Sequence, residues 1–235
     1  MVEPFELTRA APSAALSRTV TDALREMIVR GGYEPDQHVK ESDVAAALGV
    51  SRGPVREAFV QLEAEGFLEL RRHRGAFVVS LTHHDIEEVH SLRLALERLA
   101  IERAATRITP EQLAALDAVL AKMKRVRKSY TAEEAVDLDL AFHDIVFDAA
   151  DHQRLRRSWE FVRSQVAFFL HTRNTQFRDF VEVGHSEHLE LRDILARGDQ
   201  ALAAAAIEDH VTGSYERLMH LHPELDGNLS GTRGS

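Results

Sequence analysis

The chain contains no cysteine among its 235 residues, which excludes disulfide frameworks, thiol nucleophiles, iron–sulfur clusters and cysteine-ligated zinc sites. Any metal site must therefore use its 13 histidines and its acidic side chains. The chain also lacks an apolar run near the roughly 18 residues of a membrane helix, and its first residues lack the basic-then-apolar pattern of a secretory signal. We therefore expect a cytoplasmic protein with no membrane partner.

Proline is scarce, and Pro110 alone interrupts the stretch 55–222. Because proline disrupts helices, this stretch can be rich in helix. Helical periodicity runs from 82 to about 222, with breaks expected near Pro110, Ser129, Asp151, Asn174 and Gly198, and with Asp199 as the cap of the last helix. The pattern predicts an all-helical second half.

The first 80 residues combine helical and β patterns. Helices are expected at about 14–30, 41–48 and 52–65, each ending at glycine. The segment FLELRRHRGAFVVSL then holds two short β-type runs, 67–70 and 76–79, which predict one small hairpin. Three helices followed by a hairpin are the order of a winged helix-turn-helix.

These patterns define the fold class and the domains. We expect a mainly α protein, with an N-terminal winged helix-turn-helix that carries a small β-hairpin and a C-terminal all-α helical bundle. The predicted divisions are an N-terminal tail (1–13), a DNA-binding domain (14–81), an all-helical effector-binding and dimerisation domain (82–225) and a disordered tail (226–235).

The segment VSRGPVREAF has the residues that a DNA-recognition helix needs at its start. Ser51 can cap the helix and reach a phosphate, while Arg52 and Arg56 lie four residues apart on one face. An arginine fork matches the acceptor pair of guanine. At the hairpin tip, Gly75 permits a tight turn and Arg74 can approach the DNA backbone. These five residues are the predicted DNA contacts, although the arginines can also be ordinary solvated side chains.

On these motifs, residues 17–80 resemble the DNA-binding domain of the GntR family of bacterial transcription regulators. The resemblance rests on VKESDVA, GVSRGPVREAF, LEAEG and GAFV. It implies DNA contacts at Ser51, Arg52, Arg56 and Gly75, with Arg74 near phosphate. Ser42 departs from the pattern, because some members carry a contacting arginine there.

In the second half, polar side chains fall on faces that are otherwise apolar. Asp139 and His143 share one helix face with Phe142 and Val146, and His188 and His210 lie on the apolar faces of two later helices. A divalent ion is one way to satisfy these groups when they are buried. Three imidazoles and one carboxylate suit zinc first, with nickel, manganese or iron as alternatives. For each histidine taken alone, a hydrogen-bonded core or surface histidine is the competing interpretation.

Residues 85–222 are similar to the all-helical FCD-type ligand-binding domain found in one branch of these regulators. The matching segments are LRLALE, DLAFH, and a histidine before ILARGD. The resemblance implies one divalent metal per chain at Asp139, His143, His188 and His210, with a pocket above it for a small carboxylate. Many members have asparagine at the position of His152.

Two further residues are predicted to take part in ligand binding. Arg93 matches the family arginine that can pair with the acid group of the ligand, and its alternative role is an ion pair with Glu97 one turn away. His185 competes with His188 as a metal ligand, and we expect it to line the pocket or support the ligands.

The sequence thus predicts a non-enzymatic, homodimeric transcription regulator that binds an inverted-repeat DNA operator and responds to a small organic acid near a bound metal. Two other functions remain open. Glu87-x-x-His90 and Glu182-x-x-His185 resemble the spacing of di-iron carboxylate enzymes. The second half can also be a structural dimerisation bundle without a ligand.

Overall fold

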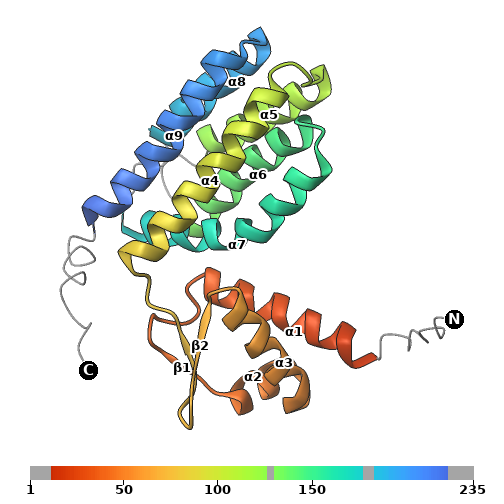
Figure 1. Ribbon diagram of the computed structural model, residues 1–235, viewed down its shortest axis with the longest axis vertical. Coiled ribbons are helices and arrows are strands. Elements are labelled where there is room, and N and C mark those ends of the chain that lie inside the picture. The colour runs from red at the N-terminus through yellow and green to blue at the C-terminus, as the bar shows by residue number, and fades with distance from the viewer. Residues whose placement is uncertain (1–11, 126–129, 177–182, 222–235) are drawn as a thin grey trace, which may run out of the picture. The chain divides into compact units, whose positions relative to one another are not determined.

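A computed structural model describes residues 12–125, 130–176 and 183–221. The chain divides into two compact units between Ser80 and Leu81. The expected tail at 226–235, and all but two residues of the expected tail at 1–13, lie outside the described residues. The fold class agrees with the sequence prediction, because a small winged-helix unit precedes an all-helical one (Figure 1).

The first unit is built from three helices and a small sheet. Its core contains Leu24 and Ile28 from the first helix and Val55 and Leu62 from the third, all fully buried. The elements are α1 (Pro12–Val29), β1 (His38–Val39), α2 (Glu41–Leu48), α3 (Arg52–Ala64), β2 (Leu68–Arg71) and β3 (Gly75–Val78). Gly49 ends α2 with φ 65°, a left-handed conformation that suits glycine at the turn before α3.

The sheet has one strand more than the sequence predicted. Its order is β1-β3-β2, and both pairings are antiparallel. The additional strand β1 places His38 opposite Phe77 and Val39 opposite Ala76. A two-residue strand offers no period-2 pattern, so its existence depends on pairing with β3 rather than on a local signal.

The second unit is entirely helical within the described residues. Its elements are α4 (His83–Ala104), α5 (Pro110–Arg125), α6 (Ala132–Ala149), α7 (Gln153–Gln176), α8 (His185–Arg197) and α9 (Gln200–Leu221). The end of α7 at Gln176 agrees with the break expected near Asn174, two residues earlier. Asn174 is buried in the last turn of that helix.

Helix α4 runs along α9 and also packs against α6 and α7, while α8 lies against α5 and α9 (Figure 1). Side chains from α6 and α7 fill the core, among them Phe142, Phe147 and Trp159. The Trp159 indole donates to Asp144 at 2.7 Å, and Arg163 donates to the same carboxylate. These bonds tie α7 to the middle of α6.

Local capping sets where several helices begin. Thr82 and Thr131 each form a capping box, with Asp85 and Glu134 respectively, at the start of α4 and α6. Asp199 accepts a bond from the Leu202 N–H and caps α9 as expected. Ser51 is the N-cap residue of α3, as expected, but its side chain makes no capping hydrogen bond.

Within the described ranges, none of the helices combines the length and the apolar character that crossing a membrane would require.

Candidate functional site

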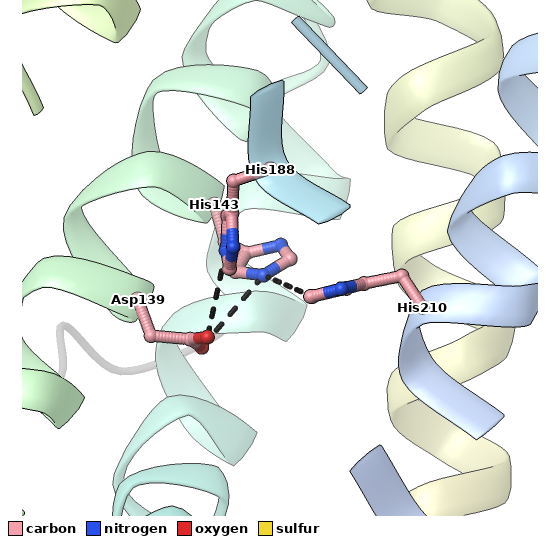
Figure 2. A group of neighbouring side chains, drawn as sticks. All are labelled: Asp139, His143, His188 and His210. Carbon is pink, nitrogen blue, oxygen red and sulfur yellow. Dashed lines mark hydrogen bonds and ion pairs between the residues drawn. The ribbon is translucent and has the colours of Figure 1, made fainter. Parts of the chain in front are cut away.

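Four buried polar side chains meet inside the helical unit. Asp139 and His143 come from α6, His188 from α8 and His210 from α9, and Figure 2 shows them converging. One potential ligand atom from each lies within 4.8 Å of all the others. None is more than 6% exposed. The structure therefore brings together all four residues of the predicted metal site.

Each histidine of this cluster is held from behind by an acceptor. His143 Nδ1 lies 2.5 Å from Glu97 Oε2, and His210 Nδ1 lies 2.9 Å from Glu187 Oε2. His188 Nδ1 faces the Gly184 carbonyl oxygen at 2.7 Å. Because each acceptor requires a proton on Nδ1, each Nε2 keeps a free lone pair. This backing is typical of metal-ligating histidines.

The distances inside the cluster fit a small cation. His143 Nε2 lies 3.3 Å from His210 Nε2 and 3.7 Å from Asp139 Oδ2, and His188 Nε2 lies 3.4 Å from Asp139 Oδ1. Donors about 2.1 Å from a tetrahedral zinc ion would stand about 3.4 Å apart. Two unprotonated nitrogens cannot hydrogen-bond to each other, so their close approach favours a cation between them.

Two atoms of the cluster lack a hydrogen-bond partner within the described residues, namely Asp139 Oδ2 and His188 Nε2. Leaving such atoms buried without a hydrogen bond costs about 1–3 kcal/mol each, and more for a charged group. A divalent ion would satisfy both at once. The donor set and these two atoms therefore fit a bound metal.

Burial sets the protonation of the site. It lowers the pKa of His188 to about 3, and the neighbouring His210 adds to this effect, so the imidazole is neutral at pH 7 and able to bind a metal. Burial would raise the pKa of Asp139, but the surrounding histidines, His143 foremost, and Arg93 outweigh it and hold that pKa below its usual value. The carboxylate is therefore ionised.

Arg93 adjoins the cluster from α4. Its Nε donates to Glu97 at 2.6 Å, so the ion pair given as its alternative role is present. The same guanidinium lies 3.3 Å from His143 Nε2 and 3.7 Å from Asp139 Oδ2. Burial would raise the pKa of Glu97, but Arg93 and His143 outweigh this effect and lower it. A carboxylate-binding role for Arg93 stays a prediction.

The remaining candidate ligands are not part of the cluster. His185 is the first residue of α8 and is half-buried, but it is not in the metal-binding group that the described residues form. His90, from the first di-iron-type pair, stacks on Tyr215 with ring centroids 4.2 Å apart. Glu182, from the second pair, lies outside the described residues.

The predicted DNA contacts of the recognition helix lie at the exposed start of α3. Ser51 precedes this helix, Arg52 is its first residue, and Arg56 follows one turn later. Arg56 Nε donates to Glu41 Oε2 of α2 at 2.8 Å, and its side chain is 65% exposed. The carboxylate thus positions the guanidinium while leaving most of it accessible.

The wing presents Arg74 and Gly75 at its exposed turn. Gly75 has φ 93°, a left-handed conformation that favours glycine, and a Cβ there would displace the exposed ring of His38, whose Nε2 would lie 2.5 Å away. Gly75 and Arg52 line one open hollow of about 490 Å³ together with Ser42, Arg71 and Arg72. Ser51, Arg56 and Arg74 are not among its lining residues.

Sequence reasoning missed the residues that orient the imidazoles. The local spacing indicates Glu97 only as a partner of Arg93, and it does not single out Glu187. Each lies on a different helix from the histidine that it contacts, and the separations along the chain are 46 and 23 residues. No local spacing rule reaches across such distances.

The chain matches two protein families. The family described as "FCD domain" matches residues 88–213, and "Bacterial regulatory proteins, gntR family" matches residues 16–78. These ranges fall in the helical unit and in the winged-helix unit respectively.

Curated relatives match along most of the chain. The probable D-xylose utilization operon transcriptional repressor of Paenarthrobacter nicotinovorans is 30% identical over 230 residues, covering 94% of this chain and 99% of the relative. The gluconate operon transcriptional repressor of Bacillus subtilis (strain 168) is 29% identical and covers 84% and 83% respectively. Among solved structures, E. coli McbR/YncC has a TM-score of 0.77 at 20% identity, covering 88% of this chain and 98% of that one, which shows a shared fold.

Proposed function

Because this chain belongs to the GntR family of bacterial regulatory proteins and carries an FCD domain, it is a DNA-binding transcription regulator, and we propose that it senses a small carboxylate through one bound divalent metal. The relatives are named as transcriptional regulators rather than enzymes, which favours a sensing role over a catalytic one. They are named after different operons, so their names do not identify the acid that this chain binds.

The observation that carries the metal proposal is the convergence of three Nε2 lone pairs on the Asp139 carboxylate. One ion per chain would be held by Asp139, His143, His188 and His210, with Glu97 and Glu187 orienting two of the imidazoles. This nitrogen-rich set suits zinc first, with nickel, manganese or iron(II) as alternatives. Bound there, the ion would supply positive charge to a carboxylate oxygen.

Arg93 is the residue that we propose to bind the carboxylate from the protein side. Its fork can present two parallel N–H donors to a carboxylate, and it lies beside the metal ligands. Its hydrogen bond to Glu97 fixes the direction of the buried guanidinium. His185, one turn before His188 on α8, is proposed to line the same pocket.

The DNA-binding proposal concerns Ser51, Arg52, Arg56, Arg74 and Gly75. The exposed start of α3 would enter the major groove, and the wing would approach the backbone. Because one recognition helix reads only a short half-site, we propose a homodimer on an inverted repeat.

Metal content tests the site directly. Full-length protein purified without chelator should hold one divalent ion per chain by elemental analysis, and His143→Ala should lose it. His90→Ala is the matched control, because His90 is outside the cluster and should leave the metal content unchanged. Two ions per chain, with loss on His90→Ala, would favour the di-iron alternative. No bound metal would favour the structural bundle.

Carboxylate sensing is tested with Arg93→Lys. Removing the guanidinium altogether would leave Glu97 buried without its cation, which typically costs 3–5 kcal/mol and endangers folding. Lysine keeps the charge but loses the planar fork. We expect this variant to retain the metal, to bind carboxylates more weakly and to lose the response of operator affinity to the acid. An unchanged response would remove Arg93 from the sensing site.

A further inference from the structure

A small apolar cavity adjoins Arg93 and lies between α4, α7 and α9. It has a volume of about 40 Å³. Its apolar walls come from all three helices, and they comprise Ile86, Val89, Val166, Phe169, Leu170, Val211 and Leu218. We call this space the tail cavity. Since Arg93 lines it and also approaches His143 and Asp139, the tail cavity and the candidate metal centre share this residue.

The polar groups around the tail cavity are few. They are Ser214, which is buried, and His90 and Tyr215, whose rings stack on each other. Burial and the charge of Arg93 lower the pKa of His90, so its imidazole is neutral at pH 7. Among the lining residues, Arg93 is therefore the one with a formal charge.

The charges at the site point to a monoanion. Arg93 carries one positive charge, and Glu97 and Asp139 carry one negative charge each. Glu187 is balanced separately by Arg217, which lies 3.1 Å away. A divalent ion would turn the single excess negative charge into a single excess positive charge, which one carboxylate neutralises. A second carboxylate would enter apolar surroundings without a cation of its own.

From this cavity and this charge balance, we infer that the effector is a monocarboxylic acid with a short hydrocarbon tail, with its carboxylate beside Arg93 and its tail in the tail cavity. This inference rests on the proposed function and names the class of acid. A polyhydroxylated acid would bury several hydroxyl groups against apolar walls that offer few partners, and each unpaired hydroxyl weakens binding.

The volume limits the length of the tail. A water-sized group needs about 10–15 Å³ of such space, so about 40 Å³ admits roughly three or four such groups. Acids of about four or five carbons should therefore fill the tail cavity.

Calorimetric titration of the zinc-loaded, full-length protein tests the tail. The probes are acetate, propanoate, butanoate and pentanoate, with succinate and 2,3,4-trihydroxybutanoate as four-carbon comparators. We expect affinity to rise about three- to fourfold per added methylene, the factor that follows from burying each group. Succinate and the trihydroxy acid should bind at least about tenfold more weakly than butanoate.

A variant that fills the tail cavity provides the second test. Val89 is half-buried on α4, and Val89→Phe should place a ring in the tail cavity without touching the proposed metal ligands. It should abolish the gain from acetate to pentanoate while retaining acetate binding. Leu92→Phe is the matched control, because Leu92 lies on the same helix, is 45% exposed and does not line the cavity. The control should retain the full increase in affinity from acetate to pentanoate.

The outcomes separate this inference from the proposed function. Equal affinity along the acid series, or tighter binding of succinate or the trihydroxy acid, would overturn the apolar tail while carboxylate sensing stands. No binding of any acid to metal-loaded protein would overturn both. A length dependence that persists in Val89→Phe would place the tail elsewhere and contradict the assignment to this cavity.

Discussion

At the residue scale, the site depends on how each imidazole is held as much as on the four converging donors. An acidic partner fixes the tautomer and the ring direction of His143 and of His210, and a backbone carbonyl does so for His188. A histidine without such a partner could rotate or carry its proton on the other nitrogen. The acceptors behind the cluster should therefore contribute to metal affinity although they do not contact the ion.

Glu187→Gln should lower zinc affinity about 10–100-fold, because it replaces the charged acceptor behind His210 with a neutral amide. Competition against a chromophoric chelator measures the change. Glu190→Gln, on the exposed side of the same helix, is the control and should bind zinc like the unmodified protein. Equal zinc affinities for the two variants would mean that Glu187 only forms the ion pair with Arg217 and does not support metal binding.

Metal-free protein should lose stability as the pH falls from about 6.5 towards 3. Burial lowers the pKa of His188 to about 3, whereas the unfolded chain has the ordinary value near 6.5. Below pH 6.5, His188 binds a proton in the unfolded state but not in the folded state, so acid favours unfolding. Urea unfolding between pH 7 and pH 4 measures the effect.

His188→Gln should flatten this pH dependence, and His84→Gln, at a well-exposed position, should leave it unchanged. The same slope in His188→Gln as in the unmodified protein would assign the pH dependence to other groups.

At the scale of elements, two helices carry residues of the two proposed sites. Helix α6 supplies both Asp139 and His143, one turn apart, and its capping box at Thr131 fixes where those turns begin. Helix α3 presents its N-terminus, where exposed N–H groups and Arg52 favour phosphate and base contacts. The wing adds Arg74 near the ring of Phe77, with 5.6 Å from the guanidinium carbon to the ring centroid.

Arg56→Ala and Arg74→Ala should weaken DNA binding in different ways. If Arg56 reads a base, its loss should cost about 1–3 kcal/mol on the operator and little on unrelated DNA. If Arg74 contacts a phosphate, its loss should weaken binding to both DNAs and reduce the slope of log affinity against log salt concentration by about one.

Titrations of operator and random DNA at several salt concentrations measure this difference. Arg98→Ala, on the helical unit, is a control that should change neither. If Arg56→Ala and Arg74→Ala had the same ratio of operator to random-DNA affinity and the same salt dependence, the proposed division between base reading and phosphate contact would be contradicted.

At the scale of the whole molecule, the chain joins a winged-helix unit that matches the gntR family to a helical unit that matches the FCD domain. Coupling between them is a free energy, because an acid that binds one arrangement of the units better shifts operator affinity by that difference, typically about 1–3 kcal/mol. The sensing proposal therefore predicts reciprocal effects, with operator DNA changing the affinity for the acid by the same factor.

Two chains should bind one operator. Sedimentation of the protein with an inverted-repeat duplex should give two chains per duplex, and each base pair replaced in one half-site should cost about 1–3 kcal/mol. A duplex with both half-sites in direct orientation is the control and should bind more weakly. A monomer that binds a single half-site as tightly as the full operator would exclude the symmetric arrangement.

Much of this organisation was readable from the sequence because it is encoded locally. Glycine at positive φ marks the turn before α3 and the wing, and the 3.6-residue period places Asp139 and His143 on the buried face of α6. Family membership and fold class were predicted from such motifs and are confirmed. The four-residue cluster was predicted by resemblance, and the structure brings those residues together.

Other features arise only when distant segments meet, so no local pattern could predict them. Strand β1 exists because two residues pair with β3. Contacts between different helices set Glu97 behind His143 and form the walls of the tail cavity. The sequence by itself determined which faces are buried and which residue types they carry, whereas tertiary packing decided which side chains orient the imidazoles and what space remains beside Arg93.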